Sequence, residues 1–173
     1  MYVIQQFLWW SFFKSVSLAF NLKPMEISTF FKISYGLYTV CTEFNGVKGG
    51  YIANTVFQVT AEPPRLAISC SKNNFTYNLL KQARKFTISV LHQNASSQLV
   101  GDFGYKSGRD ISKFDAHQFK KGELNIPIIT EGCVAYFECE IDYEFEVDTH
   151  VLFVGQVKAA ELLSSSQEPM TYA

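Results

Sequence analysis

The sequence has 173 residues, of which 47% are hydrophobic and 16% are aromatic. This length and composition suffice for one domain with a substantial core, and they exclude an intrinsically disordered chain. The formal net charge of −1 provides no basic excess for binding a nucleic acid or an anionic membrane surface, so neither is an expected partner. Any site that binds an anion must therefore be built locally.

The four cysteines do not form a metal-binding or disulfide pattern. None belongs to a C-x-x-C pair, and no histidine lies near them at the spacing of a zinc site. Cys41, Cys70 and Cys139 each lie within an apolar, strand-like run. We therefore expect these thiols to be buried and reduced, and we expect a cytoplasmic protein because the cytoplasm keeps thiols reduced.

Residues 1–24 read MYVIQQFLWWSFFKSVSLAFNLKP and are rich in aromatic side chains. They lack the early positive charge and the small-residue cleavage site of a secretory signal. Polar residues interrupt the apolar run, which argues against a membrane span and leaves a weak interfacial helix as the alternative. Because Pro24 is followed by Met25, we expect a leader outside the fold over residues 1–24 and a folded domain over residues 25–173.

The next part of the chain is predicted to contain one short helix and two strands. Apolar side chains at helical spacing predict the helix over residues 25–33, and an aromatic and β-branched run predicts a strand over residues 35–44. Asn45-Gly46 predicts a tight hairpin, since both turn positions must accept a positive φ. A second strand is expected to run on from Gly49-Gly50 through Val59.

Pro63-Pro64 cannot donate to a strand ladder and predicts a turn. The elements expected after it are a strand over 65–69, a helix over 74–84 capped by Asn73 or Asn74, a strand over 86–91, a helix over 95–103 and a glycine-rich loop over 104–110.

Within residues 134–147, apolar residues from Ala135 onward alternate with acidic residues from Glu138 onward, which predicts a long strand with one dry face and one wet, acidic face. Residues 150–157 are apolar on both sides, as in an interior strand. About six or seven sequential strands with two or three short helices favour a mainly β fold, an antiparallel Greek-key barrel, over a doubly wound sheet.

Three polar interruptions are the candidate binding sites. Ser69–Asn74 places hydroxyls, amides and one ammonium before a helix, where they can bind phosphate or simply cap the helix. Asn54-Thr55 interrupts a strand and can address the polar edge of a heterocycle. The loop that ends at Arg109 offers glycines for close approach and a guanidinium for phosphate. Together they suit one elongated ligand with a phosphate tail.

The three histidines give weaker signals. His150 lies between two strands, and a lone histidine is more often a structural hydrogen-bonding group than a catalytic one. His92 and His117 are interpreted as ordinary loop residues.

Several motifs together resemble the flavin reductase-like family of FMN-binding split barrels, in particular its flavoredoxin-type branch. They are ISYGLYTV (33–40), NTVFQVTAEPPRLAIS (54–69), KNNFTYNLL (72–80), FTISVL (86–91), VGDFGYKSGRDISKF (100–114) and THVLFVGQV (149–157). Chains of this branch usually start at the position of Met25 and continue past a TYA-like segment, so the resemblance implies a natural end beyond Ala173.

The resemblance also implies a homodimer with FMN near the subunit interface and the isoalloxazine against residues 54–58. The positions it assigns to FMN are Asn54, Thr55, Val56, Gln58, Ser69, Cys70, Ser71, Lys72, Asn73, Thr76, Phe103, Gly104, Ser107 and Arg109. It places His150 near the flavin or the nicotinamide, as the candidate catalytic residue.

The implied function is transfer of electrons from NADH or NADPH through FMN to a protein acceptor or to free flavin. Because the flavin performs the redox chemistry, the absence of an obvious acid or base is no obstacle. This chain lacks the paired C-x-x-C motifs of a fused rubredoxin, so a rubredoxin-like acceptor must be separate. The alternatives are a non-enzymatic FMN electron carrier reduced by another protein, and a flavin- or haem-storage protein.

Overall fold

The computed structural model describes residues 24–172, in two units that divide between Ile33 and Ser34. The first unit contains the 3-10 helix η1 (Ile27–Lys32), where a short helix was expected. The expected leader over residues 1–24 falls, apart from Pro24, outside the described residues. Within residues 24–172, no helix combines the length and the apolar character needed to cross a membrane.

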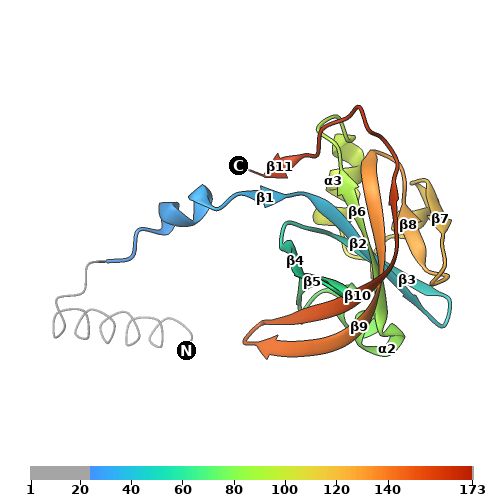
Figure 1. Cartoon of the computed structure of the whole chain (residues 1–173), viewed down its shortest axis with the longest axis horizontal. Coiled ribbons are helices and arrows are strands. Elements are labelled where there is room, and N and C mark those ends of the chain that lie inside the picture. Colours follow the sequence, from blue (N-terminus) through green and yellow to red (C-terminus); the bar gives the residue numbers. More distant parts are fainter. Residues whose placement is uncertain (1–23, 173) are drawn as a thin grey trace. The chain divides into compact units, whose positions relative to one another are not determined.

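The second unit is built on a seven-stranded antiparallel sheet in the order β3-β2-β6-β9-β10-β5-β4 (Figure 1). Its strands are β2 (Tyr38–Phe44), β3 (Val47–Ala53), β4 (Val56–Ala61), β5 (Pro64–Ser71), β6 (Lys85–Leu91), β9 (Cys133–Val147) and β10 (His150–Leu162). The shorter elements are β1 (Tyr35–Gly36), β7 (Phe119–Lys121), β8 (Pro127–Ile129), β11 (Thr171–Tyr172), α2 (Phe75–Ala83), α3 (Ser97–Gly104) and the 3-10 helix η2 (Lys113–Asp115).

The two outermost strands of this sheet, β3 and β4, are consecutive in the chain. Only Asn54 and Thr55 join them, and such a connection spans at most roughly 11 Å. The sheet must therefore curl until its two edges meet, which makes it a barrel. This confirms the predicted mainly β, antiparallel fold. The prediction of one continuous strand through Val59 is wrong, because the two polar residues separate a strand paired with β2 from one paired with β5.

Local turn and cap signals were read correctly from the sequence. Asn45 and Gly46 have φ of 49° and 80°, as the tight turn between β2 and β3 requires. The side chain of Asn74 caps α2 by accepting from the Thr76 N–H, and Ser96 caps α3 by accepting from the Leu99 N–H.

The core lies on both faces of the sheet. Val40, Ile68, Phe86 and Phe153 belong to one buried cluster, whereas a second cluster contains Cys41, Leu91, Leu99, Phe103, Phe114 and Ile129. All four cysteines are free and buried, and burial was predicted for Cys41, Cys70 and Cys139. Burial raises the pKa of Cys70, Cys133 and Cys139 to about 12, so these thiols stay protonated at neutral pH.

The prediction of a dry and a wet face along β9 is wrong in two places. In the first half of the strand, Glu138 is 1% exposed, and its carboxylate accepts hydrogen bonds from the backbone N–H groups of Glu123 and Leu124 at 3.0 and 2.8 Å. Near its end, Tyr143, Phe145 and Val147 are 52–58% exposed, because the tip of the β9–β10 hairpin projects from the sheet (Figure 1).

Candidate functional site

The site begins at the turn between β5 and α2. The Ser71 hydroxyl accepts from the Asn73 N–H at 3.3 Å, and the Lys72 N–H donates to the Thr149 carbonyl at 2.9 Å. The turn is therefore fixed from within and from the adjacent β9–β10 hairpin, and it presents Asn73 exposed to solvent. Small polar residues suit this place because they satisfy backbone groups before the helix starts.

The loop that follows α3 packs against the start of α2. The two terminal nitrogens of Arg109 each lie 3.4 Å from the Asn73 carbonyl oxygen, and the guanidinium lies over the Phe75 ring at 5.9 Å. A Cβ atom at Gly108 would come within 2.6 Å of that ring, so only glycine allows the approach. The turn before α2 and the loop after α3, which are distant in the sequence, are thus packed against each other.

A cavity of about 230 Å³ lies between these segments. It is lined by Asn73, Asn74, Phe75, Phe103, Gly104, Tyr105, Lys106, Ser107, Gly108, Arg109 and Lys113. Three of these side chains are cationic, and none of the described lining residues is Asp or Glu. A cation-rich hollow with backbone and hydroxyl donors fits a phosphate group.

A second cavity of about 340 Å³ shares Phe75, Gly108, Arg109 and Lys113 with the first. The turn between β2 and β3 contributes Gly46 to its lining, and β3 contributes Val47, Lys48 and Gly50. Arg109 and Lys113 are thus common to the linings of two neighbouring hollows.

Lys113 is a site residue that the sequence reading missed. It is 5% exposed, and its Nζ atom donates to the carbonyls of Gly50 and Phe103 at 3.0 and 3.2 Å. Burial lowers the pKa of this ammonium. Because Phe103 and Lys113 stand at the two ends of the loop, their bond closes the loop into a ring. Lys113 lies in a mixed polar and apolar stretch, RDISKFDAH (109–117), which gave no signal that a buried cation stood there.

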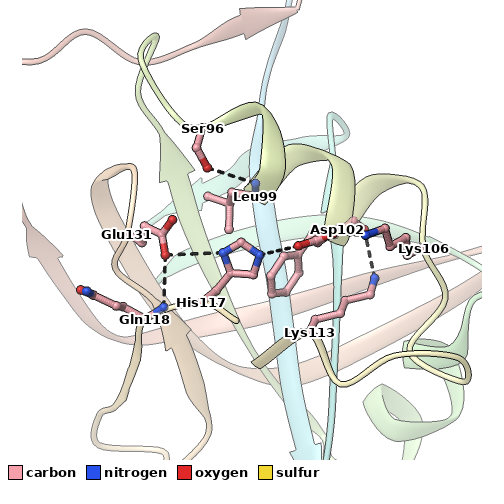
Figure 2. A network of polar contacts seen from close by, with 9 residues as sticks. Ser96, Leu99, Asp102, Lys106, Lys113, His117, Gln118 and Glu131 are labelled. Carbon is pink, nitrogen blue, oxygen red and sulfur yellow. Dashed lines mark hydrogen bonds and ion pairs between the residues drawn. The ribbon is translucent and has the colours of Figure 1, made fainter. Parts of the chain in front are cut away.

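The interpretation of His117 as an ordinary loop residue is wrong. Its ring is buried between two carboxylates: Nε2 lies 2.9 Å from Oδ2 of Asp102, and Nδ1 lies 3.5 Å from Oε2 of Glu131 (Figure 2). The other oxygen of Asp102 lies 2.6 Å from the Lys106 ammonium. A hydrogen bond from Lys106, which has the larger effect, and one from His117 lower the pKa of Asp102. Sequence spacing gave no sign of this contact, since the partners come from three separate elements.

A second group of predicted residues lies along β4, β5 and β10. The Ser69 N–H donates to the Thr55 carbonyl at 3.3 Å, and Ser71 is paired in register with His150. His150 is exposed, and its Nδ1 lies 2.9 Å from the Thr149 hydroxyl. Asn54 and Val56 flank Thr55, so the connection between β3 and β4 lies beside Ser69 of β5. Neither cavity includes them among its described lining residues.

Four of the predicted residues lie apart from these two groups. Cys70 and Thr76 are buried at 0% and 1% exposure, and the Thr76 hydroxyl faces Gly49 of β3. The Lys72 ammonium lies 2.7 Å from Glu146 instead of lining a cavity. Gln58 is exposed on β4, where its side-chain amide donates to the Thr60 carbonyl.

An exposed apolar face adjoins the second group. Tyr143, Phe145 and Val147 alternate on one face of β9 and pair with Val154, Leu152 and His150 of β10, which in turn pair with Ala67, Ser69 and Ser71 of β5. Phe57 on β4 is paired with Ala67 and is 48% exposed. Aromatic side chains and the polar positions of the second group therefore share one face of the sheet.

Comparison with known families identifies the fold and its lineage. The model of the flavin reductase like domain matches residues 30–173. The chain belongs to the flavin reductase-like family. The family named from the sequence motifs is thereby confirmed.

Two relatives illustrate this membership. Ferric-chelate reductase (NAD(P)H) of Archaeoglobus fulgidus is 42% identical over 149 residues, covering 86% of this chain and 88% of that protein. High molecular weight rubredoxin of Moorella thermoacetica is 36% identical over 149 residues, and this chain spans 65% of its length.

Solved structures agree with this grouping. NADH:FAD oxidoreductase of Streptomyces globisporus C-1027 superposes with a TM-score of 0.75 at 26% identity, over 84% of each chain. The FMN-binding protein of Thermus thermophilus superposes with a TM-score of 0.73 at 25% identity, over 82% of this chain and 79% of that one.

Proposed function

We propose that this protein is a flavin-dependent NAD(P)H oxidoreductase that binds FMN. The observation that carries the proposal is the 42% identity, along 88% of its length, to a reductase whose name specifies NAD(P)H. The NADH:FAD oxidoreductase structure supports the same donor, and it has also been solved in complex with NAD and FAD fragments. The FMN-binding protein of Thermus thermophilus supports the choice of flavin.

The two groups of site residues suit the two ends of FMN. We assign the phosphate to the smaller cavity, where Asn73, Ser107 and Arg109 supply donors. We assign the isoalloxazine to the neighbourhood of Thr55 and Ser69, beside the exposed aromatic side chains. The hydrogen bond from the Asn73 N–H to the Ser71 hydroxyl links the two groups, so one elongated ligand can reach both.

The bound flavin supplies the redox chemistry, accepting electrons from NAD(P)H and passing them on. The chain's own part is to bind and orient. Arg109, held by the Asn73 carbonyl, fixes the phosphate end, and the backbone of residues 54–56 addresses the polar edge of the ring. The exposed His150 stands beside Ser71, where it orients the ring or the nicotinamide without having to transfer a proton.

We further propose that a second copy of the chain covers the exposed aromatic face. Phe57, Tyr143, Phe145 and Val147 are each about half exposed on one side of the sheet, an unusual concentration for a surface in contact with water. A homodimer would bury them and exclude water from the ring beside them. Closure of this kind strengthens the polar contacts inside the site.

The electron acceptor that we propose is a separate protein. A separate rubredoxin-like protein is supported by the High molecular weight rubredoxin relative, in which the matching region occupies 65% of the chain. A ferric chelate is the alternative, supported by the name of the Archaeoglobus fulgidus relative.

Anaerobic mixing of the FMN-loaded protein with NADH or NADPH tests the function. Loss of the visible flavin absorbance is the expected result. A protein that holds FMN and is not reduced would instead be an electron carrier served by another reductase, and a protein that takes up no flavin would contradict both functions.

A further inference from the structure

The smaller cavity concentrates positive charge in a chain whose net charge is −1. Lys106, Arg109 and Lys113 line it, and no described lining residue is Asp or Glu; the Asp102 carboxylate that pairs with Lys106 lies outside the described lining. Like charges around one hollow repel each other unless an anion lies between them. Lys113 gives two of its three hydrogens to carbonyls, so it retains one donor. The cavity therefore favours a group with more than one negative charge, such as a terminal phosphate.

Lys106 reaches this cavity from the first residues after α3. Its side chain is 58% exposed, and its ammonium lies 2.6 Å from Oδ1 of Asp102, four residues earlier. Exposed pairs of this kind are usually loose. Here the carboxylate is 8% exposed, and its second oxygen is held by His117 at 2.9 Å (Figure 2). Lys106 is thus located at the cavity wall by a fixed partner, and two of its three hydrogens remain for a ligand.

Lys72 offers a direct contrast. It stands beside the start of α2, where sequence reasoning places a phosphate-binding lysine. Its ammonium instead lies 2.7 Å from Glu146 on the β9–β10 hairpin, and Lys72 is absent from the described linings of both cavities. Reaching the cavity would require Lys72 to give up that ion pair.

We propose that Lys106, and not Lys72, is the lysine that binds the terminal phosphate of the flavin. The assignment rests on the proposed function, because it takes the ligand to be a flavin mononucleotide. It makes Lys106 a determinant of specificity: the cation distinguishes FMN from riboflavin, which has the same ring and no phosphate.

Dissociation constants for FMN and for riboflavin test the assignment, measured by flavin fluorescence on the wild type and on Lys106→Met and Lys72→Met. A hydrogen bond between charged groups contributes about 1.5–3 kcal/mol, so Lys106→Met should weaken FMN binding roughly 10- to 100-fold. Riboflavin binding should change by less than about 2-fold, and Lys72→Met should change either constant by less than about 3-fold, as expected for loss of a surface ion pair.

Selective loss of FMN binding in Lys72→Met with retention in Lys106→Met would overturn the assignment. Equal losses of FMN and riboflavin affinity in Lys106→Met would also overturn the assignment, as would a wild type that binds both flavins with equal affinity. None of these outcomes would contradict the proposed flavin-dependent function. A second variant, Lys106→Arg, should keep FMN binding within about 5-fold of the wild type, because the charge and its donors remain. A wild type that takes up no flavin would mean that the proposed function itself fails.

Discussion

Nε2 of His117 lies 2.9 Å from Oδ2 of Asp102, and both side chains are almost removed from solvent. The pair joins the segment before β7 to α3, whose last residues open the loop around the smaller cavity. An imidazole that donates to a buried carboxylate cannot be replaced by an apolar side chain without leaving that carboxylate oxygen unsatisfied. The contact therefore sets the position of one end of the candidate site.

Replacing His117 tests this role. We expect His117→Leu to lower the melting temperature by roughly 5–10 °C, because Oδ2 of Asp102 loses its donor. His117→Gln, which keeps a side-chain N–H, should lose less than half as much. Thermal unfolding followed by circular dichroism measures both. Equal losses in the two variants would mean that the volume of the ring matters and its hydrogen bond does not.

The lowered pKa of Asp102 predicts a pH dependence of stability. Because the folded-state pKa lies below the ordinary value of 3.8, the carboxylate stabilises the fold above about pH 4, and this contribution is lost as the pH falls through the folded-state pKa. Asp102→Asn should therefore be less stable than the wild type at pH 6, and the gap should narrow toward pH 3. Urea unfolding at several pH values measures the difference in the free energy of unfolding between the wild type and Asp102→Asn. A difference that does not change with pH would contradict this role of Asp102.

Glu138 provides a prediction about the core. Its carboxylate is buried and accepts two backbone N–H groups from the segment between β7 and β8. Glu138→Gln turns one acceptor into a donor that faces a donor, so we expect a loss of about 2 kcal/mol in the free energy of unfolding. The matched control is Glu140→Gln, on the same strand but exposed and paired with Lys158, which should lose less than about 0.5 kcal/mol. Similar losses at the two positions would show that the buried contacts of Glu138 contribute nothing.

Gly108 and Gly101 form a matched pair for the wall of the cavity. A methyl group at Gly108 would press on Phe75 at 2.6 Å and displace the loop that carries Arg109. Nothing lies within 4 Å of a methyl group at Gly101, inside α3. We expect Gly108→Ala to weaken FMN binding roughly tenfold, since a displaced guanidinium loses a charge-assisted contact. Gly101→Ala should leave binding unchanged and raise stability slightly, because alanine favours a helix. The prediction fails if isothermal titration finds the same FMN affinity in both variants.

The exposed aromatic face predicts a change in oligomeric state. If a second copy covers Tyr143, Phe145 and Val147, then Phe145→Lys would bury a charge at the interface and should yield monomers at micromolar concentration. Leu162→Lys is the control, since Leu162 is exposed at the opposite end of β10. Light scattering after size exclusion reports the masses. A wild type that is monomeric, or a Phe145→Lys variant that remains dimeric, would rule out this face as the interface.

Much of the fold was readable from the sequence because its signals are local. Asn45-Gly46 forms the turn that its own sequence predicts, and Asn74 caps the helix that follows it directly. The alternation of apolar and acidic residues along β9 likewise predicts a strand. The break at Asn54-Thr55 was misread because a strand change depends on which partners each half finds. Burial along β9 was misread for the same reason: Glu138 is buried by a loop that arrives from elsewhere, and Phe145 is uncovered by the projection of the hairpin.

The candidate site was readable only in part. The motifs indicated the turn before α2 and the loop with Arg109, and the structure brings Asn73 and Arg109 into one cavity. Lys113 and His117 were missed because their partners lie in segments that only the fold brings together. Lys106 has a local partner in Asp102, but only the fold places it at the cavity. A buried cation or imidazole has no local signature when its acceptors are backbone carbonyls or a carboxylate on another element.

The most direct test of the central claim is the rate at which the protein-bound flavin loses its visible absorbance on anaerobic mixing with NADH or NADPH, compared with the same donor deuterated at the transferred position. Direct hydride transfer to the bound flavin predicts rapid bleaching that the deuterium slows severalfold. Bound flavin that the two donors leave oxidised would contradict the assignment of this chain as an NAD(P)H oxidoreductase.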